Sequence, residues 1–193
     1  MTDPLSNSVY RELPPDAVSL LKRVSAPPRL IAHLVLVHDV ASQLVERLCE
    51  TFPGVQFDAQ AVLFGACTHD IGKAIDGAEL AGPDEDHPRR GAKMLRKMGV
   101  AEERARFAYT HGNWKEAEDI RLEDLLVSLA DKTWKGKRID ELETKTANFL
   151  SAASGSPEKS CYTRLHEILQ SLAADADSRL AWQNSFSTPP LAS

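Results

Sequence analysis

The chain has 193 residues, of which 42% are hydrophobic and 26% charged, and its net charge is −5. This length and composition suit one globular domain with its own core and exclude a disordered chain. The negative net charge disfavours a protein that coats nucleic acid, and no apolar stretch is long enough to span a bilayer. Three scattered cysteines without C-x-x-C spacing, Cys49, Cys67 and Cys161, favour free thiols and a cytoplasmic protein.

Helical periodicity recurs along the chain, whereas the alternating pattern of β-strands is almost absent. We therefore expect an all-α fold with one helical domain over residues 14–183. Residues 1–13 are expected to form a loose leader, because they are acidic and contain prolines. Residues 184–193 are expected to form a flexible tail.

Start and stop signals place the individual helices. Pro28 predicts the start of a helix over 29–51, and Asp58 is the expected N-cap of a helix over 59–70 that Gly72 ends. The Gly-, Pro- and Asp-rich segment that follows is expected to be a loop. Further helices are expected at 87–98, 102–111, 121–134, 137–153 and 157–182.

Histidine and aspartate side chains are candidates for a metal site. The chain has six histidines, His33, His38, His69, His87, His111 and His166. Several of them lie next to aspartates, as in His38-Asp39, His69-Asp70 and Asp86-His87. Mixed imidazole and carboxylate ligands favour Mn, Fe, Co, Ni, Zn or Mg over a structural zinc held by thiolates. Because no H-E-x-x-H motif is present, such a site has to be assembled from distant helices.

The pair His69-Asp70 raises a specific question, because adjacent helical residues point about 100° apart. The pair ends the apolar run AVLFGACT, and Asp131 similarly closes the apolar run LLVSLA. A buried aspartate without a partner costs several kcal/mol, and a bound cation would remove that cost. A lone histidine on a helix is more often a hydrogen-bonded structural residue, which is the interpretation we give His166.

Two histidines compete for the place of the first ligand. Helical offsets from His33 are apolar, whereas the same offsets from His38 give Ser42, Glu46 and Cys49. This difference predicts that His33 faces the core and binds metal, and that His38 supports the site from outside it.

The order of these motifs resembles the HD-domain superfamily of metal-dependent phosphohydrolases. THDIGK (68–73) is similar to the family's signature, and HPRRGAKML (87–95), YTHGNW (109–114) and SLADKTWKGKR (128–138) are similar to its later motifs. The spacing most resembles the symmetrical dinucleoside tetraphosphatase-like branch. The G-Y-P element of the family's cyclic-di-GMP phosphodiesterases is missing, which argues against that activity.

The resemblance implies a divalent metal site, with two ions and Asp70 bridging them. It carries the ligand roles onto His33, His69, Asp70, His87, His111 and Asp131. The implied activity is hydrolysis of a phosphoester or phosphoanhydride in a small phosphorylated substrate, a nucleotide by expectation, by metal-activated hydroxide. Lys73 follows Asp70 by one turn and is expected to assist catalysis at a phosphate oxygen. The other expected substrate contacts are Arg90, Lys135, Lys137 and Arg138.

Two alternatives remain open at this stage. The same six ligands serve the dinuclear-iron HD-domain oxygenases, although Lys73 and the basic residues after Asp131 favour phosphate chemistry. A non-catalytic nucleotide-binding HD module is the second alternative, and the complete ligand set argues against it. Trp114 and Trp134 can stack on a base, but packing in the core is the favoured role for both.

Overall fold

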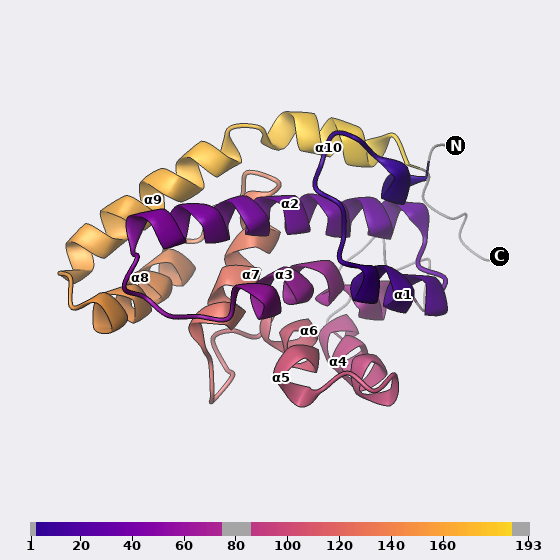
Figure 1. Cartoon of the computed structure of the whole chain (residues 1–193), viewed down its shortest axis with the longest axis horizontal. Helices are drawn as coiled ribbons and strands as arrows, with labels where there is room; N and C mark the ends of the chain where they lie inside the picture. Colours follow the sequence, from indigo (N-terminus) through magenta and orange to yellow (C-terminus); the bar gives the residue numbers. More distant parts are fainter. Residues whose placement is uncertain (1–2, 75–85, 187–193) are drawn as a thin grey trace.

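The computed structural model describes residues 3–74 and 86–186, and every regular element in these two ranges is helical (Figure 1). This confirms the predicted all-α fold. The α-helices are α1 (Pro15–Arg23), α2 (Pro28–Thr51), α3 (Ala59–Thr68), α4 (His87–Lys97), α5 (Glu102–Ala105), α6 (Phe107–Thr110), α7 (Leu122–Thr133), α8 (Asp140–Ser154), α9 (Glu158–Ala173) and α10 (Ala176–Asn184). Two short 3-10 helices are η1 (Pro4–Ser6) and η2 (Ile71–Ala74). None of the helices described is both long and apolar enough to cross a membrane.

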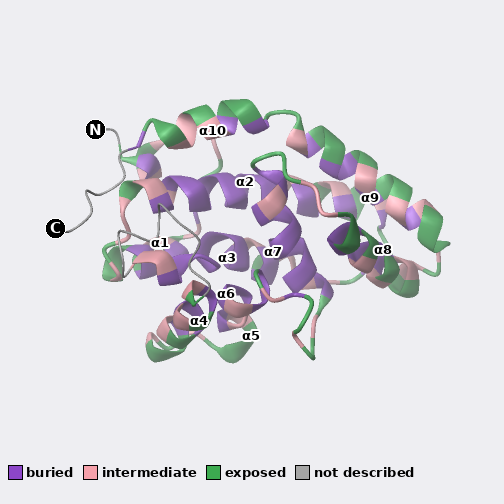
Figure 2. Ribbon diagram, turned by 180° about the vertical axis from the view of Figure 1, so that it is seen from behind, coloured by how far each residue is buried: buried purple, intermediate pink, exposed green. Residues whose placement is uncertain are grey.

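Helix α2 is the axis of the fold, because both clusters of the hydrophobic core are built on it. One cluster joins the C-terminal half of α2 to residues of α3, α7, α8 and α9, and the other joins its N-terminal half to residues of α1, α3 and α4. Figure 2 shows the buried residues concentrated in α2, α3 and α7, while the outer faces of α9 and α10 are exposed. As predicted, Pro28 occupies the first turn of α2 and the Asp58 carboxylate caps α3 by accepting from the Ala61 amide.

Two predicted helices are broken in the structure. The helix expected over 102–111 divides into α5 and α6 at Arg106, whose guanidinium pairs with the buried carboxylate of Asp124 (2.9 Å). The helix expected over 157–182 divides into α9 and α10. The buried Arg179 donates from Nη1 to the carbonyls of Leu172 (2.7 Å) and Trp134 (3.4 Å), at the ends of α9 and α7. The Leu172 carbonyl, which a continuous helix would satisfy with its own backbone, thus accepts from Arg179 instead.

Residues 3–13 differ from the loose leader expected. Pro4 and Leu13 are buried, and the Arg11 guanidinium forms a two-pronged ion pair with Glu46 of α2 (2.5 and 2.8 Å). Periodicity also missed α1, which begins at Pro15 directly after this segment. At the other end, Phe186 is buried against Trp182, so the chain is packed at least two residues beyond the expected start of the tail. The rest of the expected tail, residues 187–193, and most of the expected loop at 74–86 lie outside the described residues.

Gly72 does not end α3, because that helix stops at Thr68 and Gly72 lies within η2. Glycine is needed there because η2 lies against α4. A methyl group on Gly72 would collide with the His87 carbonyl oxygen and would lie 2.8 Å from the Gly91 backbone nitrogen. The missing side chain therefore lets the backbone that follows Asp70 touch the first turns of the helix that carries His87.

We expect Gly72→Ala to lower the free energy of unfolding by about 1–3 kcal/mol, because the added methyl group forces η2 and α4 apart. Gly54→Ala is the matched control, since a Cβ there meets nothing within 4 Å, and it should change stability by no more than about 1 kcal/mol. Urea titration followed by circular dichroism measures both. Equal stabilities for the two variants would contradict the close approach.

Candidate metal centre

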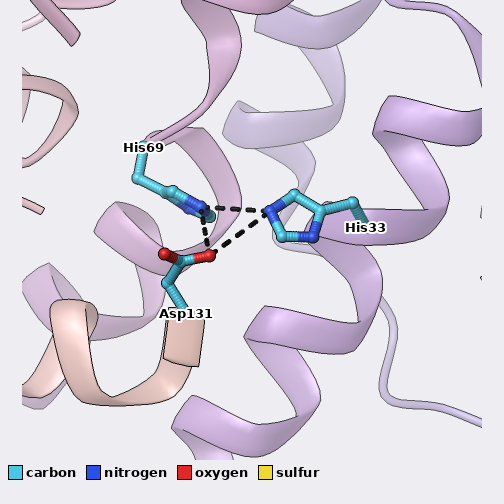
Figure 3. A group of neighbouring side chains, drawn as sticks. All are labelled: His33, His69 and Asp131. Atoms are coloured by element: carbon cyan, nitrogen blue, oxygen red, sulfur yellow. Dashed lines mark hydrogen bonds and ion pairs between the residues drawn. The ribbon is translucent and has the colours of Figure 1, made fainter. Parts of the chain in front are cut away.

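The histidines and aspartates of the motifs meet where several helices end. His69 directly follows α3, Asp131 lies in the last turn of α7, and His33 lies in the second turn of α2. These three side chains point toward one another in Figure 3. The carbonyl ends of α3 and α7 carry negative partial charge, which favours a cation at this place.

His33, His69 and Asp131 form one compact group of potential ligands. The Nε2 atoms of His33 and His69 are 3.2 Å apart, and Oδ1 of Asp131 lies 3.7 Å and 3.5 Å from them. Ligands about 2.0–2.2 Å from one ion lie roughly 3 to 3.5 Å from each other, depending on the coordination geometry. The spacing observed here is therefore close to that of ligands sharing a cation.

Asp70 joins this group to a second one, composed of His69, Asp70 and His111. Its Oδ2 atom lies 3.1 Å from His33 Nε2, and its Oδ1 atom lies 3.4 Å from His111 Nε2 and 3.1 Å from His87 Nε2. The two oxygens of one carboxylate thus face different histidines. The structure brings together all six residues expected as ligands. It also answers the question raised by the pair His69-Asp70, because α3 has ended and both side chains turn to the same place.

The histidine ring orientations suit metal binding. Nδ1 of His69 donates to the Ala66 carbonyl (3.1 Å), and Nδ1 of His111 donates to the Ala108 carbonyl (3.0 Å). Because a carbonyl oxygen only accepts, these contacts place the ring proton on Nδ1 and leave the Nε2 lone pair facing the centre. Oδ1 of Asp70 is buried and accepts no hydrogen bond within the described part of the chain. A cation would satisfy these converging lone pairs.

The charges at the centre are those that a divalent ion needs. Burial alone would raise the pKa of Asp70, but His69 and the imidazoles of His111 and His33 hold it well below its usual value. Burial would likewise raise the pKa of Asp131, and Lys132 and His69 hold it well below its usual value. Burial lowers the pKa of His111 and keeps that ring neutral. Carboxylates and imidazoles together are ligands that fit Mn, Fe, Co, Ni or Zn.

A cavity of about 340 Å³ opens beside this cluster and carries several cations. Lys73 lines it and pairs with Asp70 (2.7 Å), and Lys132 pairs with Asp131 (2.5 Å). Lys135 lines it too from an exposed position, where partial desolvation together with Lys132 and Lys73 lowers the pKa of its ammonium group. Sequence analysis gave no role to Lys132, although its place next to Asp131 is a usable signal. It also missed Arg29, four residues before His33, and Gln183 of α10.

Three of the expected substrate contacts lie outside this lining. Arg138 forms a two-pronged ion pair with Glu143 (2.7 and 2.6 Å), a buried carboxylate that also contacts His166 (3.3 Å). That pair gives Arg138 a structural role, and it agrees with the structural interpretation of His166. Lys137 is exposed, and Arg90 lies 3.9 Å from Asp86 on the first turn of α4. Among the four cations expected to contact substrate, the cavity lining includes Lys135.

His38 and the two tryptophans occupy other positions. His38 is buried beside Asp39 and Arg11 and takes no part in the cluster, whereas His33 does. Trp114 packs in the core, as favoured. Trp134 is also buried, and its ring meets His33 edge-on with centroids 5.0 Å apart, so it forms an apolar wall behind that imidazole.

Comparison with known proteins agrees with this geometry. The HD domain family model matches residues 30–134, which include all six clustered residues. The HD domain of the phosphodiesterase PgpH from L. monocytogenes, whose crystal structure is in complex with cyclic-di-AMP, superposes with a TM-score of 0.52 at 14% identity. The alignment covers 79% of this chain and 94% of that one, and at this identity it shows the shared fold alone. The comparison with curated proteins finds no match.

His38 should make stability depend on pH. Burial, together with nearby Arg11, lowers its pKa from 6.5 to about 4 despite the adjacent Asp39. In the unfolded chain, His38 becomes protonated below about pH 6.5, whereas in the folded chain it stays neutral until about pH 4. Protonation therefore favours the unfolded chain, and the free energy of unfolding falls as the pH falls from about 6.5 to about 4. His38→Gln should remove about 3 kcal/mol of the loss between pH 7 and pH 4. Urea unfolding at several pH values measures the difference, and parallel pH profiles for the two proteins would refute it.

Proposed function

Because this chain belongs to the HD-domain family, we propose that it is a metal-dependent phosphohydrolase that cleaves a phosphoester or phosphoanhydride bond. One observation carries the proposal. Six histidine and aspartate side chains, Asp70 among them, converge beside a cationic cavity. Imidazole and carboxylate ligands leave room for water and a phosphoryl oxygen in the coordination of a divalent ion. The cations beside them match the charge of a phosphate.

The residues divide by chemistry into metal ligands and phosphate contacts. His33, His69 and Asp131 would hold one ion, and His87 and His111 would hold a second, with Asp70 between them. A bound divalent ion supplies Lewis acidity, which lowers the pKa of water and offsets negative charge on the phosphoryl oxygens. Lys73 lies within reach of the same space and would turn from Asp70 toward a phosphoryl oxygen, where its fixed charge stabilises the transition state. Lys135 would bind the phosphate from the end of α7.

A nucleotide is the substrate class we favour. The crystal structure of the PgpH HD domain holds cyclic-di-AMP, which shows that a domain of this fold accommodates a nucleotide. The motif spacing that resembles the dinucleoside tetraphosphatase-like branch points the same way and remains a prediction. Hydrolysis rates over a panel of nucleotides with each of Mn, Fe, Co, Ni, Zn and Mg would identify the substrate and the metal.

The oxygenase alternative uses the same ligands, so chemistry has to separate it from hydrolysis. The oxygenase would be established if the iron-loaded protein consumed oxygen in the presence of a phosphonate or polyol and released no phosphate from phosphoesters. A protein that binds nucleotides without turnover under any metal would establish the non-catalytic module. The cations around the cavity favour the hydrolase over the oxygenase, and the complete ligand set favours it over the non-catalytic module.

Asp70→Ala should lose bound metal and reduce phosphate release at least about a hundredfold, because Asp70 contacts both groups of ligands. Elemental analysis and a phosphate-release assay measure the two effects, and circular dichroism checks that the variant stays helical. Asp177→Ala on the exposed face of α10 is the matched control. Full metal occupancy in Asp70→Ala would contradict the assignment of Asp70 as a metal ligand.

The number of metals can be measured separately. If two ions bind, His111→Ala should lower the metal content from about two to about one per chain, because His111 belongs to the group that excludes His33 and Asp131. If a single ion binds at His33, His69 and Asp131, the same variant should lose activity at unchanged metal content. Elemental analysis of the purified variant decides between a dinuclear and a mononuclear centre.

A further inference from the structure

The cavity beside the metal centre holds more positive charge than its own carboxylates neutralise. Its cationic lining consists of Arg29, Lys73, Lys132 and Lys135. Two of the four are paired with carboxylates of the metal centre, as described above. Within residues 3–74 and 86–186, neither Arg29 nor Lys135 has a carboxylate at ion-pair distance. Among the described lining residues, four cations and two carboxylates leave two positive charges without a carboxylate partner, before any metal ion is counted.

Arg29 is oriented without being neutralised. It lies four residues before His33 on α2, so its side chain leaves the helix one turn away on the same face. Its Nη2 atom donates to the side-chain oxygen of Asn184 (2.9 Å), the last residue of α10, which packs along α2 (Figure 1). An amide acceptor fixes the guanidinium but leaves its charge available to an anion.

The polar groups around the cavity come from two parts of the chain. All six candidate ligands lie within residues 30–134, the segment shared with the HD domain family. Arg29, Lys135 and Gln183 lie outside it, and they enter the cavity from the start of α2, the end of α7 and α10. The metal centre is thus built within the matched segment, whereas Arg29 and Lys135 lie one residue beyond its two ends and Gln183 comes from α10.

We propose that Arg29 and Lys135 form a second anion-binding position, and that the substrate carries a second phosphoryl group that binds there without reacting. The inference rests on the proposed phosphohydrolase function and names its substrate class. A guanidinium presents paired donors to a phosphate, and an ammonium adds a point charge. A substrate with one phosphoryl group leaves both charges uncompensated. Gln183 both donates and accepts hydrogen bonds, so it suits the part of the substrate that joins the two phosphoryl groups.

Two inert probes test this position by calorimetry on the metal-loaded protein. Methylphosphonate offers one phosphoryl-like group and methylenediphosphonate offers two, and their phosphorus–carbon bonds resist phosphohydrolase action. The wild-type protein should bind the diphosphonate at least tenfold more tightly. Arg29→Gln and Lys135→Met should each weaken the diphosphonate about tenfold and methylphosphonate less than twofold, at unchanged metal content.

Arg47→Gln, on α2 and away from the cavity, is the matched control and should bind both probes like the wild type. Equal affinity of the wild type for the two probes would overturn the second position. Equal weakening of both probes in the two variants would overturn it too, because this would indicate a general effect of charge. A third outcome separates this inference from the proposed function. If the protein turned over no phosphorylated substrate but still bound the diphosphonate tenfold more tightly than methylphosphonate, the hydrolase would be refuted and the second anion-binding position would be supported.

Discussion

The arrangement of the molecule depends on one buried carboxylate. Asp70 is 2% exposed and lies among the Nε2 atoms of histidines from three other helical segments. An isolated charge at that depth costs far more than most single contacts recover, so the surrounding groups have to compensate it. Lys73 and the imidazoles do so in part, and the lone pairs that still converge there are best satisfied by a cation. Helices α2, α3, α4 and α7 are held at the separations that this compensation requires.

One contact that positions His87 beside Asp70 is made by the backbone of Gly72. The contact of Gly72 with the first turns of α4 brings His87 within 3.1 Å of the carboxylate. A short 3-10 turn and a helix start can be placed this closely only when no Cβ stands between them. The metal centre and the fold are therefore specified by the same contact, and a small change in the backbone there alters both.

Sequence periodicity was sufficient to predict much of the helical fold and of the metal centre. The apolar face that follows His33 predicted which histidine of α2 joins the cluster, and the apolar runs ending at Asp70 and Asp131 predicted buried carboxylates. Helix breaks were not predictable, because α9 and α10 are separated by hydrogen bonds from Arg179 to carbonyls distant in sequence. The position of Gln183 depends on that break, so no local pattern pointed to it. The ion pair of Arg138 was not predictable either, since its partner Glu143 looks like an ordinary surface residue in the sequence.

The hydrogen bonds of Arg179 also bear on where the domain ends. They join the backbone of Trp134, three residues after Asp131, to the last turn of α9. The hydrophobic cluster on the C-terminal half of α2 likewise continues through Leu142, Leu150 and Leu169. The segment shared with the HD domain family consequently shares its hydrophobic core with helices that lie outside it. Helices α8 to α10 complete its interior, and a chain cut after residue 134 would expose that interior to water along one whole side.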